Sequence, residues 1–315
     1  MNNPSIPRLD CQLAKSLHAV DHRRHCLRLS AFVAIYIASA FAAVSLATHV
    51  AWAAAIPCYL VAATALHGIS LFTHEAVHST LSRNRFWNRF LGAACAIPVL
   101  QNCSAYRVLH LQHHEHLGDD GDPDHYENYT HWSWMVFGMN WLRLIIGYPV
   151  YVAAIPILGF RQGRARDRFW IVCEVLATAI LMALIWHSPI PKQVLLHGWL
   201  IPMLFINTMV NIRGMSQHTL LEHATDEVQG TRSILTHPVV AWFMCNENYH
   251  LEHHLYPGVP WYHLPQVHQT LGGELARQGA PFIPSYFSFV KSFIFHSIKR
   301  SPWGRRTQSV SKTEV

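Results

Sequence analysis

Residues 250–254 read His-Leu-Glu-His-His, and the same spacing of histidines occurs at residues 110–114, which read His-Leu-Gln-His-His. Residues 74–78, His-Glu-Ala-Val-His, form a third cluster with two histidines four positions apart. Positions three and four apart lie on one face of an α-helix, so each cluster presents its imidazoles to one side. Neutral imidazole is a good ligand for iron, zinc, copper and nickel. The eight clustered histidines therefore predict a site for two metal ions.

The composition is typical of a membrane protein. Of 315 residues, 51% are apolar and 13% are charged, whereas soluble domains contain about 25% charged residues. The seven cysteines are scattered and form no Cys-x-x-Cys pair. This pattern argues against a disulfide framework, a zinc ribbon and a cysteine-ligated iron–sulfur cluster.

Four apolar runs are long enough to cross a bilayer, which takes about 20 residues. They cover Ser30–Ala47, Ala53–Phe72, Phe169–Trp186 and Val194–Val210. The histidine clusters lie just outside such runs, so we expect the metal centre at a membrane surface. A metal centre there indicates O₂ chemistry on a lipid.

A fifth apolar stretch, Trp132–Phe160, contains Arg143 and two prolines. We expect it to form interfacial helices in the headgroup region. If all three clusters share one site, the chain must cross the membrane an even number of times between the second and third clusters. Three apolar stretches lie there, so we expect two of them to span the bilayer and Trp132–Phe160 not to do so. The predicted fold class is an all-α integral membrane protein with four transmembrane helices, interfacial helices and a cytosolic helical cap that carries the histidine-rich site.

The distribution of Lys and Arg predicts the orientation. Residues 1–29 hold five, residues 73–168 hold nine and residues 211–315 hold nine, whereas the two short opposite links hold only Lys192. Cytoplasmic loops carry the excess of positive charge, so we expect both termini and all three clusters on the cytoplasmic side of a multi-pass inner or cytoplasmic membrane. The net charge of +6 is interpreted as topology and anionic-lipid contact, not nucleic-acid binding.

Three segments are expected along the chain. Residues 1–29 form a cytosolic N-terminal segment, in which charged residues without a small-residue cleavage site predict no removable signal peptide. Residues 30–270 form the membrane domain. Residues 271–315 form a cytosolic C-terminal segment, and its polar end is expected to be disordered.

A ninth histidine ligand is expected after the fourth apolar run, where both His218 and His223 occur. His218 is preferred because it lies nearer the end of the run. Ligating histidines usually donate their second ring N–H to a carboxylate or carbonyl. The carboxylates close enough in sequence to do so are Glu75, Glu115, Asp122, Asp124 and Glu252.

Residues 74–78 also match His-Glu-x-x-His, the motif of zinc proteases, in which the glutamate is the general base. A membrane zinc protease is therefore an alternative of another class. It leaves the six histidines of the other two clusters without a role.

The order His-x-x-x-His, His-x-x-His-His, His-x-x-His-His, separated by paired apolar runs, resembles the membrane-bound fatty acid desaturase and hydroxylase superfamily. Residues 246–265, Asn-Glu-Asn-Tyr-His through Tyr-His-Leu-Pro, look like its third box and proline-rich continuation. The resemblance covers about residues 30–270. It implies two iron ions, O₂ as co-substrate and metal ligands at His74, His78, His110, His113, His114, His218, His250, His253 and His254.

The resemblance leaves the substrate open. The first box has three intervening residues, whereas the stearoyl-CoA type has four, and the third begins with His250 instead of the Gln of desaturases fused to cytochrome b5. No cytochrome b5 haem motif is present, so a separate donor of ferredoxin, rubredoxin or cytochrome b5 type is expected. A lipid or acyl-chain desaturase is the leading interpretation. We expect such an enzyme to hold the chain of its substrate in an apolar tunnel. Residues 110–125 also look like a box of β-carotene hydroxylases, so a carotenoid hydroxylase or ketolase is the alternative.

Overall fold

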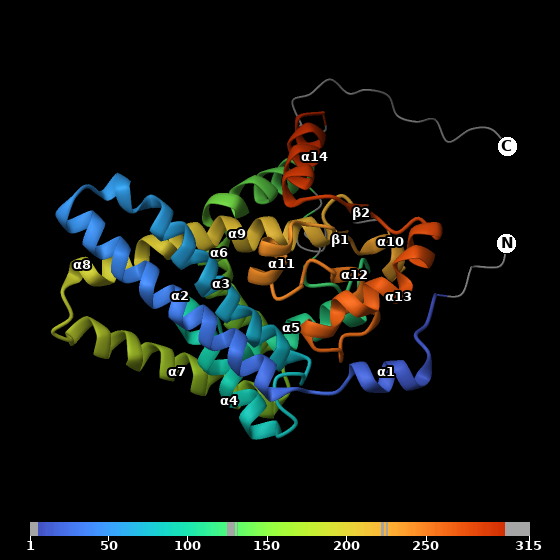
Figure 1. Ribbon diagram of the computed structural model, residues 1–315, viewed down its shortest axis with the longest axis horizontal. Coiled ribbons are helices and arrows are strands. Elements are labelled where there is room, and N and C mark those ends of the chain that lie inside the picture. Colours follow the sequence, from blue (N-terminus) through green and yellow to red (C-terminus); the bar gives the residue numbers. More distant parts are fainter. Residues whose placement is uncertain (1–5, 125–129, 131, 222–223, 225, 300–315) are drawn as a thin grey trace.

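The computed structural model describes residues 6–124, 130, 132–221, 224 and 226–299, so the alternative ligand His223 lies outside the described residues. Over these residues the chain is mostly helical (Figure 1). The helices are α1 (Cys11–Leu17), α2 (His22–His49), α3 (Ile56–Val77), α4 (Arg85–Ala96), α5 (Cys103–Glu115), α6 (Ser133–Gln162), α7 (Ala165–His187), α8 (Lys192–Leu195), α9 (Ile201–His218), α10 (Glu227–Gly230), α11 (Pro238–Phe243), α12 (His250–Leu255), α13 (Leu264–Arg277) and α14 (Tyr286–Lys299).

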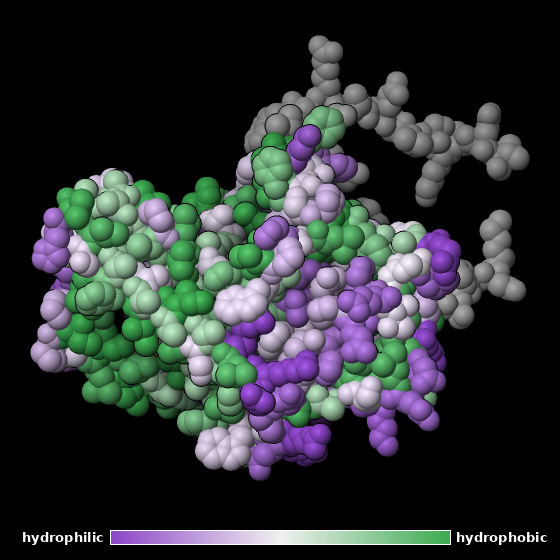
Figure 2. All heavy atoms as spheres, in the orientation of Figure 1, coloured by the Kyte–Doolittle hydropathy of each residue, from purple (hydrophilic) through white to green (hydrophobic). Residues whose placement is uncertain are grey.

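Five stretches of helix have the length and hydropathy of a membrane span. They are His22–His49, Trp52–Val77, Trp134–Gln162, Ala165–His187 and Lys192–His218. Four of them contain the four predicted apolar runs. Figure 2 shows apolar side chains gathered over the end of the molecule formed by α2, α3, α7 and α8, and hydrophilic ones toward α12 and α13. Large apolar side chains such as Phe41 and Leu204 are more than 70% exposed, as expected of surfaces that face lipid.

At Trp132–Phe160 the sequence predicts several interfacial helices, but the structure contains one continuous helix, α6, with Pro149 and Pro156 inside it. A proline removes one backbone N–H and crowds the preceding turn. The opening next to Pro149 is bridged by Asn207 of α9: the Tyr148 N–H donates to its Oδ1 at 2.7 Å, and its Nδ2 donates to the Leu144 carbonyl at 2.7 Å. A side chain from a neighbouring helix thus satisfies the backbone groups that leave the helical ladder.

Helix α3 is the central element of the helical bundle. It packs between α2 and α9, and nearly all of its second half is buried. A Cβ atom at Gly68 would lie 2.6 Å from the ring of Phe32 on α2, so this crossing needs glycine. The close packing fixes the end of α3, where the first histidine cluster begins.

A smaller unit of short elements lies beyond the ends of α3 and α9 (Figure 1). Strands β1 (Ser233–Ile234) and β2 (Phe282–Ile283) form a two-stranded parallel sheet. Helix α12 packs on α13 and β1, and Leu251 and Leu264 form a buried cluster that Leu17 of α1 joins. This packing holds α12 and the third histidine cluster against the rest of the chain.

Candidate metal centre

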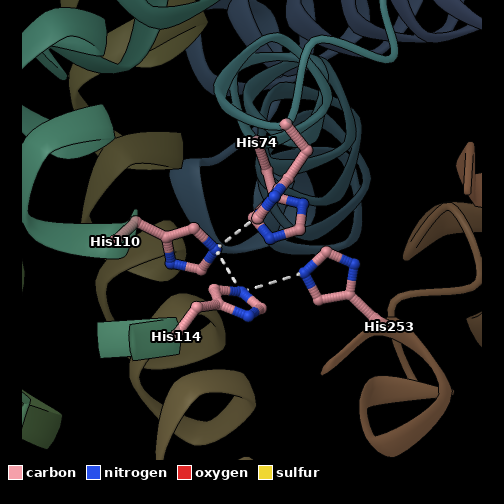
Figure 3. A group of neighbouring side chains, drawn as sticks. His74, His110, His114 and His253 are labelled. Carbon is pink, nitrogen blue, oxygen red and sulfur yellow. Dashed lines mark hydrogen bonds between the residues drawn. The ribbon is translucent and has the colours of Figure 1, made fainter. Parts of the chain in front are cut away.

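The nine predicted histidine ligands converge on one site. His74 lies in the last turn of α3 and His78 directly follows it, α5 and α12 each carry three, and His218 is the last residue of α9. Figure 3 shows the imidazoles of His74, His110, His114 and His253 turned toward one another from α3, α5 and α12. Six of the nine are buried and the other three are half-buried: His78, His114 and His218.

The nitrogens form two groups. Five ligand atoms lie within 4.8 Å of one another in the first group: His74, His78, His110, His114 and His253. The second group consists of His113, His218 and His254, whose ligand atoms also lie within 4.8 Å of one another. His250 belongs beside the second, since its Nε2 lies 3.1 Å from that of His218 and 3.2 Å from that of His254. The arrangement therefore offers two adjacent sites.

Neighbouring Nε2 atoms are spaced as ligands of one ion are. In the first group the distances are 2.9 Å for His78–His110, 3.1 Å for His110–His114 and 3.2 Å for His114–His253. Two imidazole nitrogens about 2.1 Å from one metal ion, at right angles to each other, are about 3 Å apart. The donor set and its spacing fit a metal ion in each group.

The second group shows why a cation is needed. His113 Nδ1 donates to Asp122 Oδ1 at 2.9 Å, and His218 Nδ1 donates to the Gly230 carbonyl at 2.9 Å. With the proton of each neutral ring on Nδ1, the two Nε2 lone pairs face each other at 3.2 Å. Only a shared cation, a proton or a metal ion, makes that contact favourable.

Burial disfavours protonation of most of these histidines. Desolvation, assisted by neighbouring imidazoles, lowers the pKa of His114 to about 2, and it also holds five other pKa values well below the usual range: those of His78, His110, His250, His253 and His254. His113 differs: burial lowers its pKa, but the hydrogen bond to Asp122 and the negative charges of Asp122 and Asp124 together outweigh this effect and raise the pKa. The histidines with lowered pKa values favour the neutral imidazole, which is the form that binds metal.

The predicted carboxylates lie in different surroundings. Asp122 contacts His113 as described, whereas Asp124 is exposed and lies 3.9 Å from the same nitrogen. Glu252 is fully buried, and its oxygens lie 2.5 Å from Ser233 Oγ and from His268 Nδ1.

Glu75 accepts a hydrogen bond from Thr80 Oγ1 at 2.7 Å and one from the Trp261 N–H at 3.4 Å. A carboxylate oxygen of Glu75 also lies within 4.8 Å of a ring nitrogen of His74. Glu115, the last residue of α5, is exposed.

The sequence analysis missed Glu247. Its Oε1 lies 3.0 Å from His74 Nδ1 and its Oε2 lies 4.0 Å from His250 Nδ1, and the side chain is 1% exposed. Glu247 thus joins the first and third boxes from outside both. The available signal was its position three residues before His250, where a helical continuation of the box would bring it alongside that ring.

A cavity of about 170 Å³ lies against the histidines, and imidazoles of both groups line it: His74, His110, His113, His218 and His250. Its other walls come from α3, α5, α6 and α9, and they include Tyr106, Arg143, Arg213 and Gln217. The wall beside the metal groups is therefore more polar than the apolar tunnel that was expected.

Comparisons with known proteins agree with this geometry. The family model for fatty acid desaturase matches residues 50–286. A sphingolipid delta(4)-desaturase/C4-monooxygenase of Mus musculus is 24% identical over 76% of this chain and 71% of its own length. A dihydrorhizobitoxine desaturase of Bradyrhizobium elkanii is 27% identical over 73% and 72%, and an sn-1 oleoyl-lipid 12-desaturase of Arthrospira platensis is 23% identical over 75% and 73%. This chain belongs to the fatty acid desaturase family and is an oxidoreductase of the desaturase type.

Proposed function

We propose that the two histidine groups hold two iron ions and that the protein uses O₂ to remove two hydrogens from an alkyl or acyl chain. The observation that carries the proposal is the convergence of nine histidines in two adjacent groups, with Nε2 atoms 2.9 to 3.2 Å apart. Imidazole ligands and O₂ chemistry favour iron over zinc, which has no redox chemistry.

The bound irons supply the oxidising chemistry, and the chain supplies its placement. Asp122 and the Gly230 carbonyl hold the Nδ1–H of His113 and His218, which directs the two Nε2 lone pairs into the site. Glu247 places a buried carboxylate oxygen 3.0 Å from His74 Nδ1, where its negative charge favours the metal-bound form of that imidazole. Electrons come from a separate donor of ferredoxin, rubredoxin or cytochrome b5 type.

The proposed substrate class is a lipid or another molecule with an alkyl chain. The relatives support this class through their names, which specify a sphingolipid, an oleoyl lipid and dihydrorhizobitoxine. The apolar surface over α2, α3, α7 and α8 supports access from a membrane (Figure 2). In the proposed topology α2, α3, α7 and the stretch Lys192–His218 cross the membrane and α6 does not. We place the metal centre on the cytoplasmic side, because all but one of the Lys and Arg residues then lie on that side.

Hydroxylation is the second candidate reaction. The name of the Mus musculus relative includes C4-monooxygenase as well as desaturase, so one protein of this kind carries both activities in its name. Mass spectrometry of lipids from an expressing host separates the two outcomes, since desaturation loses two hydrogens and hydroxylation gains one oxygen. The zinc protease alternative is disfavoured by family membership and by the nine-histidine site.

Metal analysis of the purified full-length protein tests the proposal. We expect about two irons per chain, since nine imidazoles exceed the needs of one ion. Replacing His78, His113 or His253 with Ala removes a ligand and is expected to abolish both iron binding and product. His49→Ala is the matched control, because His49 is exposed at the far end of α2. One zinc and no iron in the wild-type protein would refute the proposal.

A further inference from the structure

The cavity beside the histidines has a wall that is rich in hydrogen-bond donors. Side chains from four helices contribute guanidinium, amide, phenol and imidazole groups to it: His67, Tyr106, Arg143, Tyr151, Arg213 and Gln217. Imidazoles of both metal groups line the same space. Whatever occupies the cavity therefore meets the donors and the metal ligands at once.

Several of these donors are buried without a protein partner. His67 Nε2, Arg213 Nε and Gln217 Nε2 form no hydrogen bond with the described residues, and the His67 and Gln217 side chains are 1% and 6% exposed. A buried polar group left unpaired has lost its hydrogen bonds to water without gaining others, which is unfavourable. Such groups around a cavity are paired when a ligand or water enters it.

A plain hydrocarbon segment would not pair them. Methylene groups at this position would exclude water and leave the donors unsatisfied, which opposes binding. The cavity also includes apolar side chains, namely Leu71, Leu109, Ile155 and Val210, so a short length of chain fits beside an oxygen-rich group.

The charges at the wall set the character of that group. Arg143 and Arg213 both line the cavity, and Asp124 is the acidic residue that lines it. Arg143 Nε donates to Asn211 Oδ1 at 3.3 Å, and Arg213 lies 4.0 Å from Glu247. Two guanidiniums and one lining carboxylate favour a neutral or singly anionic acceptor over a cation.

From this wall we infer that the substrate carries an oxygen-rich polar group, such as a carboxylate, or a hydroxyl with an amide, next to the carbons that are oxidised. Oxidation then falls on the first few carbons beside the polar group instead of in the middle of a hydrocarbon tail. The inference rests on the proposed function and specifies its substrate class.

Product analysis gives the first test. Purified iron-loaded protein, supplied with electrons, is offered N-stearoyl-sphinganine in vesicles of distearoyl phosphatidylcholine, and mass spectrometry locates each new double bond or hydroxyl. The expected products are modified on carbons adjacent to a hydroxyl, amide or ester group. Products modified only in the middle of the C18 chains would overturn the inference while leaving the proposed function intact.

Binding to the metal-free full-length protein gives a second test that needs no catalysis. Stearate and octadecane are compared as ligands by quenching of tryptophan fluorescence. His67→Leu and Gln217→Leu each remove one donor and are expected to weaken stearate binding about fivefold, the equivalent of one hydrogen bond. His49→Ala, at the exposed far end of α2 and away from the cavity, keeps wild-type affinity. Equal affinity for both ligands in all variants would overturn the inference, whatever the iron content.

Discussion

Replacing Glu247 with Gln tests whether a carboxylate outside the histidine boxes controls metal affinity. The carboxylate lies 3.0 Å from His74 Nδ1 and 4.0 Å from His250 Nδ1, with 1% of the side chain exposed. Gln keeps the size and an acceptor oxygen but loses the charge. A buried carboxylate beside a metal-ligating imidazole raises the basicity of that ligand.

Removal of a carboxylate behind a metal ligand generally costs 10 to 100-fold in metal affinity, which is about 1.4 to 2.7 kcal/mol. We therefore expect Glu247→Gln to weaken the more sensitive of the two metal sites about tenfold. The larger loss is expected in the group of His74, because that contact is the shorter one.

Anaerobic titration of Fe²⁺ against a competing chelator measures this loss in detergent-purified protein. Glu115→Gln is the matched control, since Glu115 directly follows the second box but is exposed. Circular dichroism verifies that both variants are folded. Equal affinities for the two variants would refute the assigned role of Glu247.

Three further predictions concern stability and topology. Asn207→Leu leaves the Tyr148 N–H unpaired and removes one of two hydrogen bonds to the Leu144 carbonyl, which also accepts from Thr208 Oγ1 at 3.2 Å. A loss of about 1 to 3 kcal/mol is therefore expected in detergent unfolding; an unchanged stability would mean that α6 does not depend on this bridge. Metal-free protein should lose stability as the pH falls below 6.5, because the unfolded chain then binds protons that the folded histidines with lowered pKa reject. Each such histidine contributes at most about 1.4 kcal/mol per pH unit to this loss, and flat stability from pH 7.5 to 5.5 would contradict it. In a background without native cysteines, Cys at Ala51 and Ser188 should react with an impermeant label outside intact cells and Cys at Asp120 should not; labelling at Asp120 would contradict the cytoplasmic placement.

The convergence of the three boxes follows from local rules that the sequence displays. Spacings of three and four place the histidines of α5 and α12 on one face of each helix. The position of His218 after an apolar run was enough to suggest that it joins them. These patterns are short-range: side chains three or four positions apart on a helix point to the same side of it.

Features that depend on contacts between distant segments were not predictable in this way. The continuity of α6 depends on Asn207, about sixty residues further along the chain. Glu252 lies within the third box, yet its oxygens contact Ser233 and His268, while Glu247, outside the box, contacts His74. Side-chain direction in these cases is decided by packing, which residue spacing does not encode.

The position of α12 in the chain has a consequence for biosynthesis. The last of the five candidate membrane spans ends at His218. Three of the nine histidines, those of α12, come later in the chain, from His250 onward. Chains are made from the N-terminus and their early parts fold first. During translation the membrane helices are therefore complete while one third of the metal-binding set is still missing. The site is completed only after α12 has been made, so a bound metal marks a chain that has been translated beyond Leu255.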